Sequence, residues 1–324
     1  MRLSRRKFIQ QAGLASAGIM AAPTLFAACS PKKGQQIPAI GLQLYTLREL
    51  LDKDAKGTLK NVSAIGYGTV ETYGYSSLDG KGTFWGLKPA ELKATLDDLN
   101  LKTFSGHYGL DDFLTEGNGK IDAVKPLLEV AKSLGQQYLV VPMVPGAILN
   151  KLNLKDYQFI AAQLNKAGEL AKEIGLGIAY HNHFFEFRKL EDGRTGYDVL
   201  LEETEASLVN LEIDIFWAQK AGADIPALFS KHPGRFPMWH VKDIDKTHPE
   251  IVTGPALDSL PVDSIFNRIK FTEVGTGTID FKALFALKEK AGLKQFYVEQ
   301  DQIYVPDKFE SIKNSFDYIK GNLL

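Results

Sequence analysis

Short apolar runs alternate with amphipathic stretches from residue 37 to the end of the chain. Each run is short and rich in β-branched and aromatic residues, which is typical of a buried strand bounded by turns. The predicted strands cover residues 39–45, 69–73, 103–108, 138–142, 177–183, 208–214, 236–241 and 295–300. The pattern therefore predicts eight strands separated by longer connections.

The connections between these strands carry apolar residues at helical spacing. The pattern is clearest over residues 88–100, 120–135, 154–175, 281–292 and 307–319. Glycine stands where several connections end, and there it can adopt the left-handed conformation of a helix C-cap. The glycines in these positions are Gly66, Gly135, Gly175 and Gly292.

Alternating strands and helices predict parallel strands joined by right-handed crossovers. Such a chain can close into an eight-fold barrel or form an open, doubly wound sheet. No glycine-rich dinucleotide loop follows the first predicted strand, and eight is the strand number of a (β/α)8 barrel. We expect an α/β protein with a single (β/α)8 TIM barrel domain over residues 37–324.

The first 28 residues predict an export signal that precedes the barrel. The basic segment contains the pair Arg5-Arg6 and is followed by a small-residue apolar stretch over residues 12–28, as in twin-arginine signals. This stretch is short and rich in Gly and Ala for a spanning helix, although an N-terminal membrane anchor is the alternative. We expect an exported protein with residues 29–36 as a tether.

Cys29 is the single cysteine of the chain and follows the sequence LFAA, which resembles a lipoprotein cleavage site with an unusual Phe26. A lipid on Cys29 would attach the protein to a membrane, and a plain periplasmic protein is the alternative. A lone cysteine also excludes a disulfide scaffold.

Composition places the chain among ordinary globular proteins, with 324 residues, 44% hydrophobic and 24% charged. The formal charge is −1, and removal of residues 1–28 takes away four basic residues and no acid, which gives −5. This balance argues against a nucleic-acid partner. A small-molecule substrate is expected, and a homo-oligomer stays open.

Polar side chains gather at the carboxyl ends of the predicted strands, where the loops of a TIM barrel build the active site. Side chains alternate between the two faces of a strand, so that His181 and His183 share one face, as do His240 and Lys242. The polar strand ends are Gln43, Tyr45, Glu71, Tyr73, His107, residues 181–183, Glu212, Asp214, residues 240–243 and residues 299–301.

Four of these residues lie on consecutive predicted strands and form the best candidate metal site. Imidazoles and carboxylates without thiolates suit a divalent ion such as Mn, Co, Zn or Mg. A buried polar network without metal is the alternative. The four candidate ligands are His181, Asp214, His240 and Glu299.

Several segments resemble the sugar phosphate isomerase/epimerase group of xylose isomerase-like TIM barrels (AP endonuclease family 2 type). They are residues 41–46 (GLQLYT), 180–187 (YHNHFFEF), 212–217 (EIDIFW), 240–243 (HVKD) and 274–280 (VGTGTID). The resemblance implies a divalent ion held by Glu, Asp, His and Glu at strand ends five to eight. Asp214, His240 and Glu299 match the last three, while His181 replaces the first glutamate, which normally also transfers protons.

The group includes ketose epimerases, aldose-ketose isomerases, inosose dehydratases and AP endonucleases. Epimerisation requires a base on each face of the reacting carbon. Glu299 is the expected base, with Glu71, His183 and Glu186 as candidates for its partner. Lys242 would stabilise an enediolate, or instead form a salt bridge with Glu212 or Asp214.

The remaining polar and aromatic residues at the strand ends are candidate sugar contacts. We expect His107, Asn182 and His183 to bind hydroxyl groups, and Tyr45 and Trp217 to form an apolar wall. The sequence predicts a metal-dependent isomerase or epimerase that acts through an ene-diolate. Because sugar phosphates are scarce outside the cytoplasm, the expected substrate is a non-phosphorylated sugar or keto-sugar. The alternatives are a dehydratase or lyase on a keto-sugar or keto-glycoside, and a non-catalytic sugar-binding lipoprotein.

Overall fold

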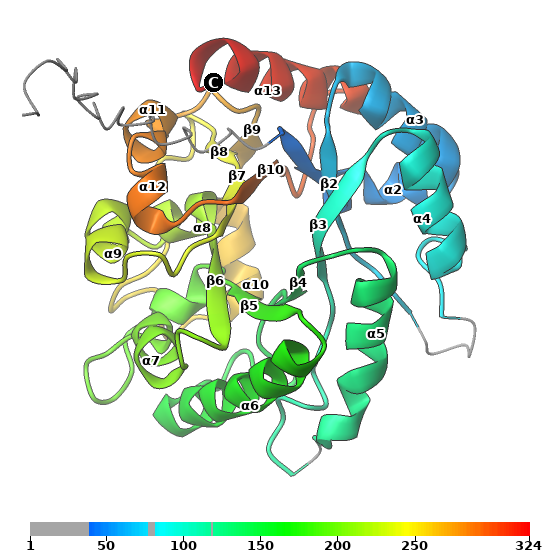
Figure 1. Cartoon of the computed structure of the whole chain (residues 1–324). Coiled ribbons are helices and arrows are strands. Elements are labelled where there is room, and N and C mark those ends of the chain that lie inside the picture. Colours follow the sequence, from blue (N-terminus) through cyan, green and yellow to red (C-terminus); the bar gives the residue numbers. More distant parts are fainter. Residues whose placement is uncertain (1–38, 77–81, 118) are drawn as a thin grey trace, which may run out of the picture. The chain divides into compact units, whose positions relative to one another are not determined.

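A computed structural model describes residues 39–76, 82–117 and 119–324, which belong to one compact unit. Eight parallel strands close into a barrel in the order β1-β10-β7-β6-β5-β4-β3-β2 (Figure 1). The strands are β1 (Gly41–Gln43), β2 (Thr69–Thr72), β3 (Lys102–His107), β4 (Tyr138–Val141), β5 (Gly177–His181), β6 (Val209–Asp214), β7 (Met238–Val241) and β10 (Gln295–Val298). The predicted TIM barrel and the positions of its strands are confirmed.

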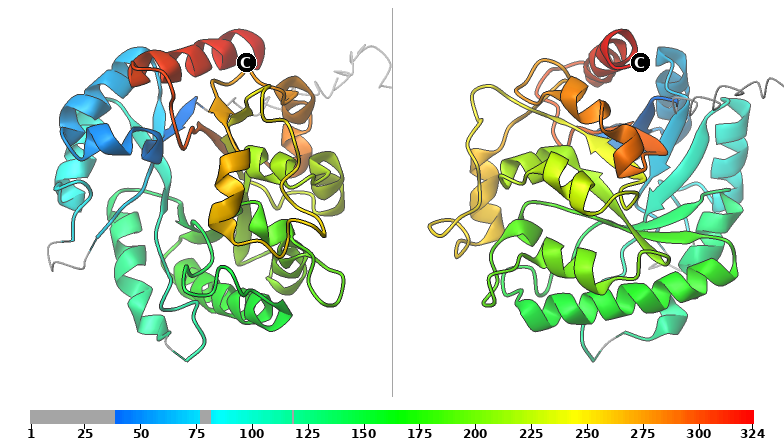
Figure 2. Two further views of the ribbon diagram at one scale, coloured as in Figure 1. Left: turned by 180° about the vertical axis from the view of Figure 1, so that it is seen from behind. Right: turned by 60° about the vertical axis from the view of Figure 1, so that its left-hand side comes forward.

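Helices surround the barrel in all three views (Figures 1 and 2). The long ones are α3 (Ala55–Ile65), α4 (Pro89–Asp98), α5 (Lys125–Ser133), α6 (Leu154–Glu173), α7 (Gly196–Glu203) and α13 (Lys308–Asn322). The shorter ones are α2 (Arg48–Leu51), α8 (Ile215–Lys220), α9 (Ile225–Lys231), α10 (Val262–Ile265), α11 (Phe281–Phe285) and α12 (Lys288–Ala291). Among the described residues, no helix combines the length and the hydropathy that a membrane span requires.

The four predicted cap glycines have positive φ angles, between 79° and 119°. The helix predicted over residues 281–292 is divided into α11 and α12, and the one predicted over residues 120–135 begins with a separate 3-10 turn, Ile121–Ala123. The predicted export signal, Cys29 and the tether over residues 29–36 lie outside the described residues, so they stay predictions.

Alternation of side chains along the strands fills the barrel interior in layers. At the amino-terminal end, Met238, Ala179, Val140 and Tyr138 form an apolar cluster. Further towards the carboxyl ends of the strands, the side chains that face the interior are polar. Backbone register sets Glu212 level with both His181 and Met238, and Asp214 level with His240. The barrel therefore has an apolar floor below a polar upper half.

A small antiparallel sheet that the sequence pattern did not predict lies after the barrel strand β7. It pairs β8 (Asp243–Ile244) with β9 (Phe271–Thr272). The buried Asp243 carboxylate accepts hydrogen bonds from the backbone amides of Ile244, Gly275, Gly277 and Ile279, at 2.9–3.1 Å. An added Cβ at Gly277 would lie 2.3 Å from Asp243 Oδ1, so glycine is required for this approach.

Replacement of Asp243 by alanine should destabilise the barrel, because four backbone donors lose their acceptor at once. We expect the free energy of unfolding to fall by about 3–5 kcal/mol in urea denaturation. Asp280→Ala is the matched control, since Asp280 accepts one amide bond, from Ala283, at the start of α11 and should cost about 1 kcal/mol. Equal losses in the two variants would contradict the anchoring role of Asp243.

Candidate active site

A cavity of about 430 Å³ opens above the polar half of the barrel interior. Its lining comes from the carboxyl ends of strands β2, β3, β5, β7 and β10 and from the loops that follow β1, β4 and β6. The lining residues are Tyr45, Tyr73, Gly74, Tyr75, His107, Gly109, Pro142, Met143, His181, His183, Trp217, Lys242, Phe266, Glu299 and Asp301. The cavity thus lies where the fold is expected to hold an active site.

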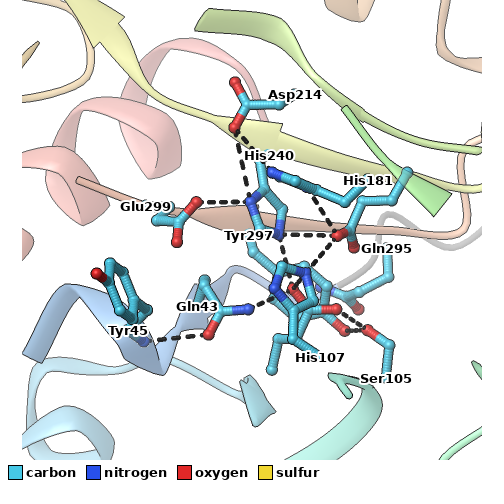
Figure 3. A network of polar contacts seen from close by, with 12 residues as sticks. Gln43, Tyr45, Ser105, His107, His181, Asp214, His240, Gln295, Tyr297 and Glu299 are labelled. Carbon is cyan, nitrogen blue, oxygen red and sulfur yellow. Dashed lines mark hydrogen bonds and ion pairs between the residues drawn. The ribbon is translucent and has the colours of Figure 1, made fainter. Parts of the chain in front are cut away.

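The structure brings the four candidate metal ligands together at one side of this cavity (Figure 3). Their donor atoms all lie within 4.8 Å of one another, and all four residues are buried. Asp214 Oδ2 is 3.6 Å from His181 Nε2 and 3.8 Å from His240 Nδ1, while Glu299 Oε2 is 2.7 Å from His240 Nδ1. Two imidazoles and two carboxylates converging on one point fit a divalent metal ion.

Lys242 lies beside the candidate metal ligands and is surrounded by carboxylates. Its Nζ is 2.8 Å from Asp214 Oδ2, 2.6 Å from Glu299 Oε2 and 2.9 Å from Asp301 Oδ1. Burial alone would lower the pKa of Lys242, but these carboxylates outweigh it and raise the pKa above its ordinary value. Lys242 is therefore charged. Of the two salt-bridge partners that the sequence analysis offers, Glu212 and Asp214, it is Asp214 that contacts Lys242.

Glu212 forms a second layer of polar contacts below the candidate ligands. Its Oε2 atom lies 2.7 Å from His107 Nε2, 3.1 Å from His181 Nδ1 and 3.2 Å from His240 Nε2. Burial raises the pKa of Glu212 to about 7. Sequence reasoning placed Glu212 at a strand end but assigned it no place in the metal site. Its spacing of two residues from Asp214, which puts both on one face, was the available signal.

Glu71 also lies in this lower layer. Its Oε2 is 2.7 Å from both His240 Nε2 and Gln43 Nε2, and its other oxygen accepts a hydrogen bond from Ser105. Ser105 in turn contacts the Tyr297 hydroxyl at 2.8 Å. Glu71 is fully buried and does not line the cavity.

Glu186 occupies the turn after β5, away from the cavity lining. It accepts hydrogen bonds from the Tyr180 hydroxyl at 2.6 Å and from the His183 backbone amide at 2.8 Å. Its carboxylate thus holds the backbone of a cavity residue. Among the described residues, Glu299 and Asp301 are the acids that line the cavity.

Four of the five predicted sugar contacts line the cavity: Tyr45, His107, His183 and Trp217. Asn182 does not, because its side chain accepts a bond from the Asp214 backbone amide at 3.0 Å and ties β5 to β6. Asp214 also caps α8 by accepting the Trp217 amide bond at 2.9 Å. The same carboxylate therefore contributes one oxygen to the candidate metal site and orients the tryptophan beside it.

Aromatic side chains line another part of the cavity and its rim. Tyr45 packs edge-on against Tyr73 at 5.2 Å between ring centroids, and Tyr73 packs against Trp85 at 5.3 Å. Tyr45 is exposed at the rim, where Figure 3 shows its ring apart from the buried imidazoles. The cavity thus combines buried charged groups with aromatic surface.

Phe266 also lines the cavity, from the long loop that follows β8, and its ring packs against Trp217 at 6.3 Å between centroids. Lys220, buried in α8, donates hydrogen bonds to the backbone carbonyls of His248, Glu250 and Arg268, at 2.9, 2.5 and 3.2 Å. These three acceptors match the three N–H donors of the ammonium group and compensate for the hydration that it loses on burial. These bonds fix the loop that carries Phe266.

Comparison with known proteins gives the chain a family context. The family model described as "Xylose isomerase-like TIM barrel" matches residues 59–303. An inosose dehydratase from Clostridium perfringens is 30% identical over 174 residues, which is 54% of each chain. The chain thus spans about half the length of this curated relative.

Two solved structures share the fold over most of both chains. A sugar phosphate isomerase/epimerase from Parabacteroides distasonis superposes with a TM-score of 0.70 at 24% identity, covering 87% of this chain and 93% of the other. The IOLI protein with a bound zinc atom gives a TM-score of 0.65 at 17% identity, covering 88% and 98%. At these identities the likeness concerns the fold.

The Glu186 carboxyl predicts a pH dependence of stability. Burial raises its pKa to about 7 from the model-compound value of 4.5. The folded state therefore binds this proton more tightly than the unfolded state, so the contribution to stability is complete below pH 4.5 and is lost as the pH rises through 7. The loss is about 3 kcal/mol.

Glu186→Gln should remove this loss, because the amide is neutral and can still bond to both the Tyr180 hydroxyl and the His183 amide. Relative to wild type, its free energy of unfolding in urea should increase by up to about 3 kcal/mol between pH 5 and pH 8. Glu129→Gln makes the same change at an exposed site and serves as the control. An unchanged difference between Glu186→Gln and wild type at the two pH values would contradict this prediction.

Proposed function

The chain belongs to the xylose isomerase-like TIM barrel family, and within this family of sugar-processing enzymes we propose that it is a metal-dependent lyase. It would eliminate water or an alcohol from a keto-sugar or keto-glycoside. This reaction is the dehydratase or lyase alternative of the sequence analysis, and we propose it in place of the isomerase or epimerase reaction expected there. The inosose dehydratase relative, at 30% identity, supports this preference.

The observation that carries the proposal is the one-sided placement of the cavity carboxylates. Glu299 and Asp301 stand two residues apart at the end of β10, and both contact Lys242. Epimerisation requires a base on each face of the reacting carbon. The candidate carboxylate partners, Glu71 and Glu186, lie outside the cavity lining, with their oxygens bonded to other groups.

His183 lines the cavity and was the third candidate partner. Burial lowers its pKa to about 3, so that the ring is neutral and a weak base towards carbon. A neutral ring is suited to hydrogen bonding with a sugar hydroxyl, the role expected from the sequence. One base and one acid on the same side favour elimination.

In the proposed reaction Glu299 removes the proton next to the substrate carbonyl. Burial raises the pKa of Glu299, but Lys242 and His240 outweigh this effect and lower it, which keeps the carboxylate ionised. Its Oε2 contacts His240 Nδ1 and Lys242 Nζ, and Oε1 is left for the substrate. A divalent ion held by His181, Asp214, His240 and Glu299 would polarise the carbonyl and acidify this C–H bond.

The electron pair of the broken C–H bond forms the new double bond as the C–O bond at the next carbon breaks. Burial raises the pKa of Asp301 to about 6, so that this acid, on the same side as Glu299, can take up a proton and give it to the departing oxygen. Lys242 lies between them and stabilises negative charge that develops on the substrate. The products are an unsaturated keto-sugar and either water or the alcohol of the glycoside.

The lining also supports a substrate without phosphate. Lys242 is the basic side chain other than histidine among the described lining residues, and it already contacts three carboxylates. A phosphate group would therefore find no unpaired lysine or arginine among these side chains. The aromatic lining residues Tyr45, Tyr73 and Phe266 suit the ring face of a sugar or an aglycone. The predicted export of the chain is consistent with such a substrate.

The reaction can be tested in D₂O with a panel of free keto-hexoses and nitrophenyl keto-hexosides, analysed by NMR. We expect chelator-sensitive formation of an unsaturated keto-sugar together with one equivalent of water or nitrophenol. Deuterium incorporated into a sugar that keeps all its oxygens would instead establish an isomerase or epimerase. Tight binding without turnover of any compound would favour a sugar-binding protein.

Glu299→Gln should lower kcat by about 10²–10⁴-fold, because the proton acceptor is lost. The metal content measured by emission spectroscopy should stay near the wild-type value, since the amide oxygen and three further donors remain. Glu129→Gln again serves as the control for the same change at the surface. Retention of full turnover in Glu299→Gln would rule out Glu299 as the base.

A further inference from the structure

The two histidines of the candidate metal site each have one ring nitrogen at that site and the other against a buried carboxylate. His181 has Nε2 near Asp214 and Nδ1 3.1 Å from Glu212 Oε2. His240 has Nδ1 near Glu299 and Nε2 2.7 Å from Glu71 Oε2. In Figure 3, dashed contacts join both rings to Asp214 and join His240 to Glu299.

A neutral imidazole carries one proton and one lone pair, and only the lone pair can bind a metal. A carboxylate that accepts the N–H bond on the inner side therefore directs the lone pair to the outer side. For His181, Glu212 is the acceptor in this position.

We propose that Glu212 is a positioning residue that makes His181 a metal ligand, by holding its proton on Nδ1 and its Nε2 lone pair towards Asp214, His240 and Glu299. The inference rests on the metal centre of the proposed function. It assigns a role to a residue that lies outside the cavity lining and outside the set of four candidate ligands.

The same carboxylate oxygen orients His107. His107 Nε2 lies 2.7 Å from Glu212 Oε2, and His107 lines the cavity. With the proton of His107 on Nε2, its Nδ1 lone pair is left to accept a hydrogen bond from a substrate hydroxyl. One buried carboxylate thereby sets the tautomers of a metal ligand and of a substrate contact.

Glu212 is well held for this task by the barrel. Strand register places it beside His181 on β5 and Met238 on β7, and its side chain is fully buried. Groups on central strands keep their positions more closely than groups on loops. A shift of Glu212 would move both imidazoles, because all three meet at one oxygen atom.

The test is a metal titration of the purified protein without substrate. We expect Glu212→Gln to weaken Zn²⁺ binding by about 10–100-fold, measured by competition with a chromophoric chelator. The visible spectrum of the Co²⁺-loaded variant should also change, because the His181 ligand is disturbed. Glu129→Gln should bind Zn²⁺ like the wild type.

A double-mutant cycle separates this role from a general loss of structure. In a His181→Glu background the ligand is a carboxylate, which has no N–H group for Glu212 to accept. Glu212→Gln should then change the Zn²⁺ affinity by less than about threefold. An equal loss in both backgrounds, or no loss in the single variant, overturns the proposal.

NMR of the wild type with ¹⁵N-labelled histidine gives an independent result should Glu212→Gln fail to fold. The proposal requires the Nδ1–H tautomer of His181 in the Zn²⁺-loaded protein, and the Nε2–H tautomer overturns it. A wild-type protein that binds neither Zn²⁺ nor Co²⁺ overturns the metal centre and this proposal together. Normal Zn²⁺ binding by Glu212→Gln overturns the proposal alone.

Discussion

The site depends on a cluster of imidazoles and carboxylates packed into the upper half of the barrel with almost no water contact. His240, Glu71, Glu212 and Asp214 are fully buried. A buried charge is tolerated only where a partner of opposite charge or a hydrogen bond compensates its lost hydration. Here each ring contacts a carboxylate on another strand, and the His107–Glu212 and His240–Glu71 contacts join strands that are not neighbours, so the barrel must be closed before the cluster is satisfied. The geometry of the site is therefore a property of the whole fold.

The alternation of side chains between the two faces of each strand is the reason why part of this site could be predicted from the sequence. Consecutive parallel strands end at the same rim, so His181, Asp214, His240 and Glu299 were expected to converge, and the structure brings them together. The depth of a side chain within the barrel follows from strand register, which the pattern does not contain. Strand register sets Glu212 level with His181, so that this acid, although it stands near the end of its strand, lies below the candidate metal site.

Residues outside the regular strands were the least predictable. Asn182 stands between two histidines in sequence, yet its side chain accepts a hydrogen bond from the backbone of the next strand and does not line the cavity. Glu186 follows His183 by three residues, and it folds back onto the His183 amide. The Asp243 carboxylate beside the β8–β9 sheet binds the amide of its neighbour Ile244 and three amides from the distant loop of residues 275–279. Such contacts depend on tertiary structure and leave no periodic signal.

The placement of acids, more than the fold, decides which reaction this barrel can favour. Isomerases, epimerases and dehydratases all need an acidic C–H bond beside a polarised carbonyl, and they differ in where protons return. With an imidazole at the end of β5, the carboxylates that face the cavity come from one strand, β10. Proton removal and leaving-group protonation can then take place on one side of the sugar, whereas inversion of a carbon requires a group on the other. Histidine in place of the glutamate at the end of β5 also brings a second ring nitrogen, Nδ1 of His181, which needs a hydrogen-bond acceptor. Glu212 occupies the position of that acceptor.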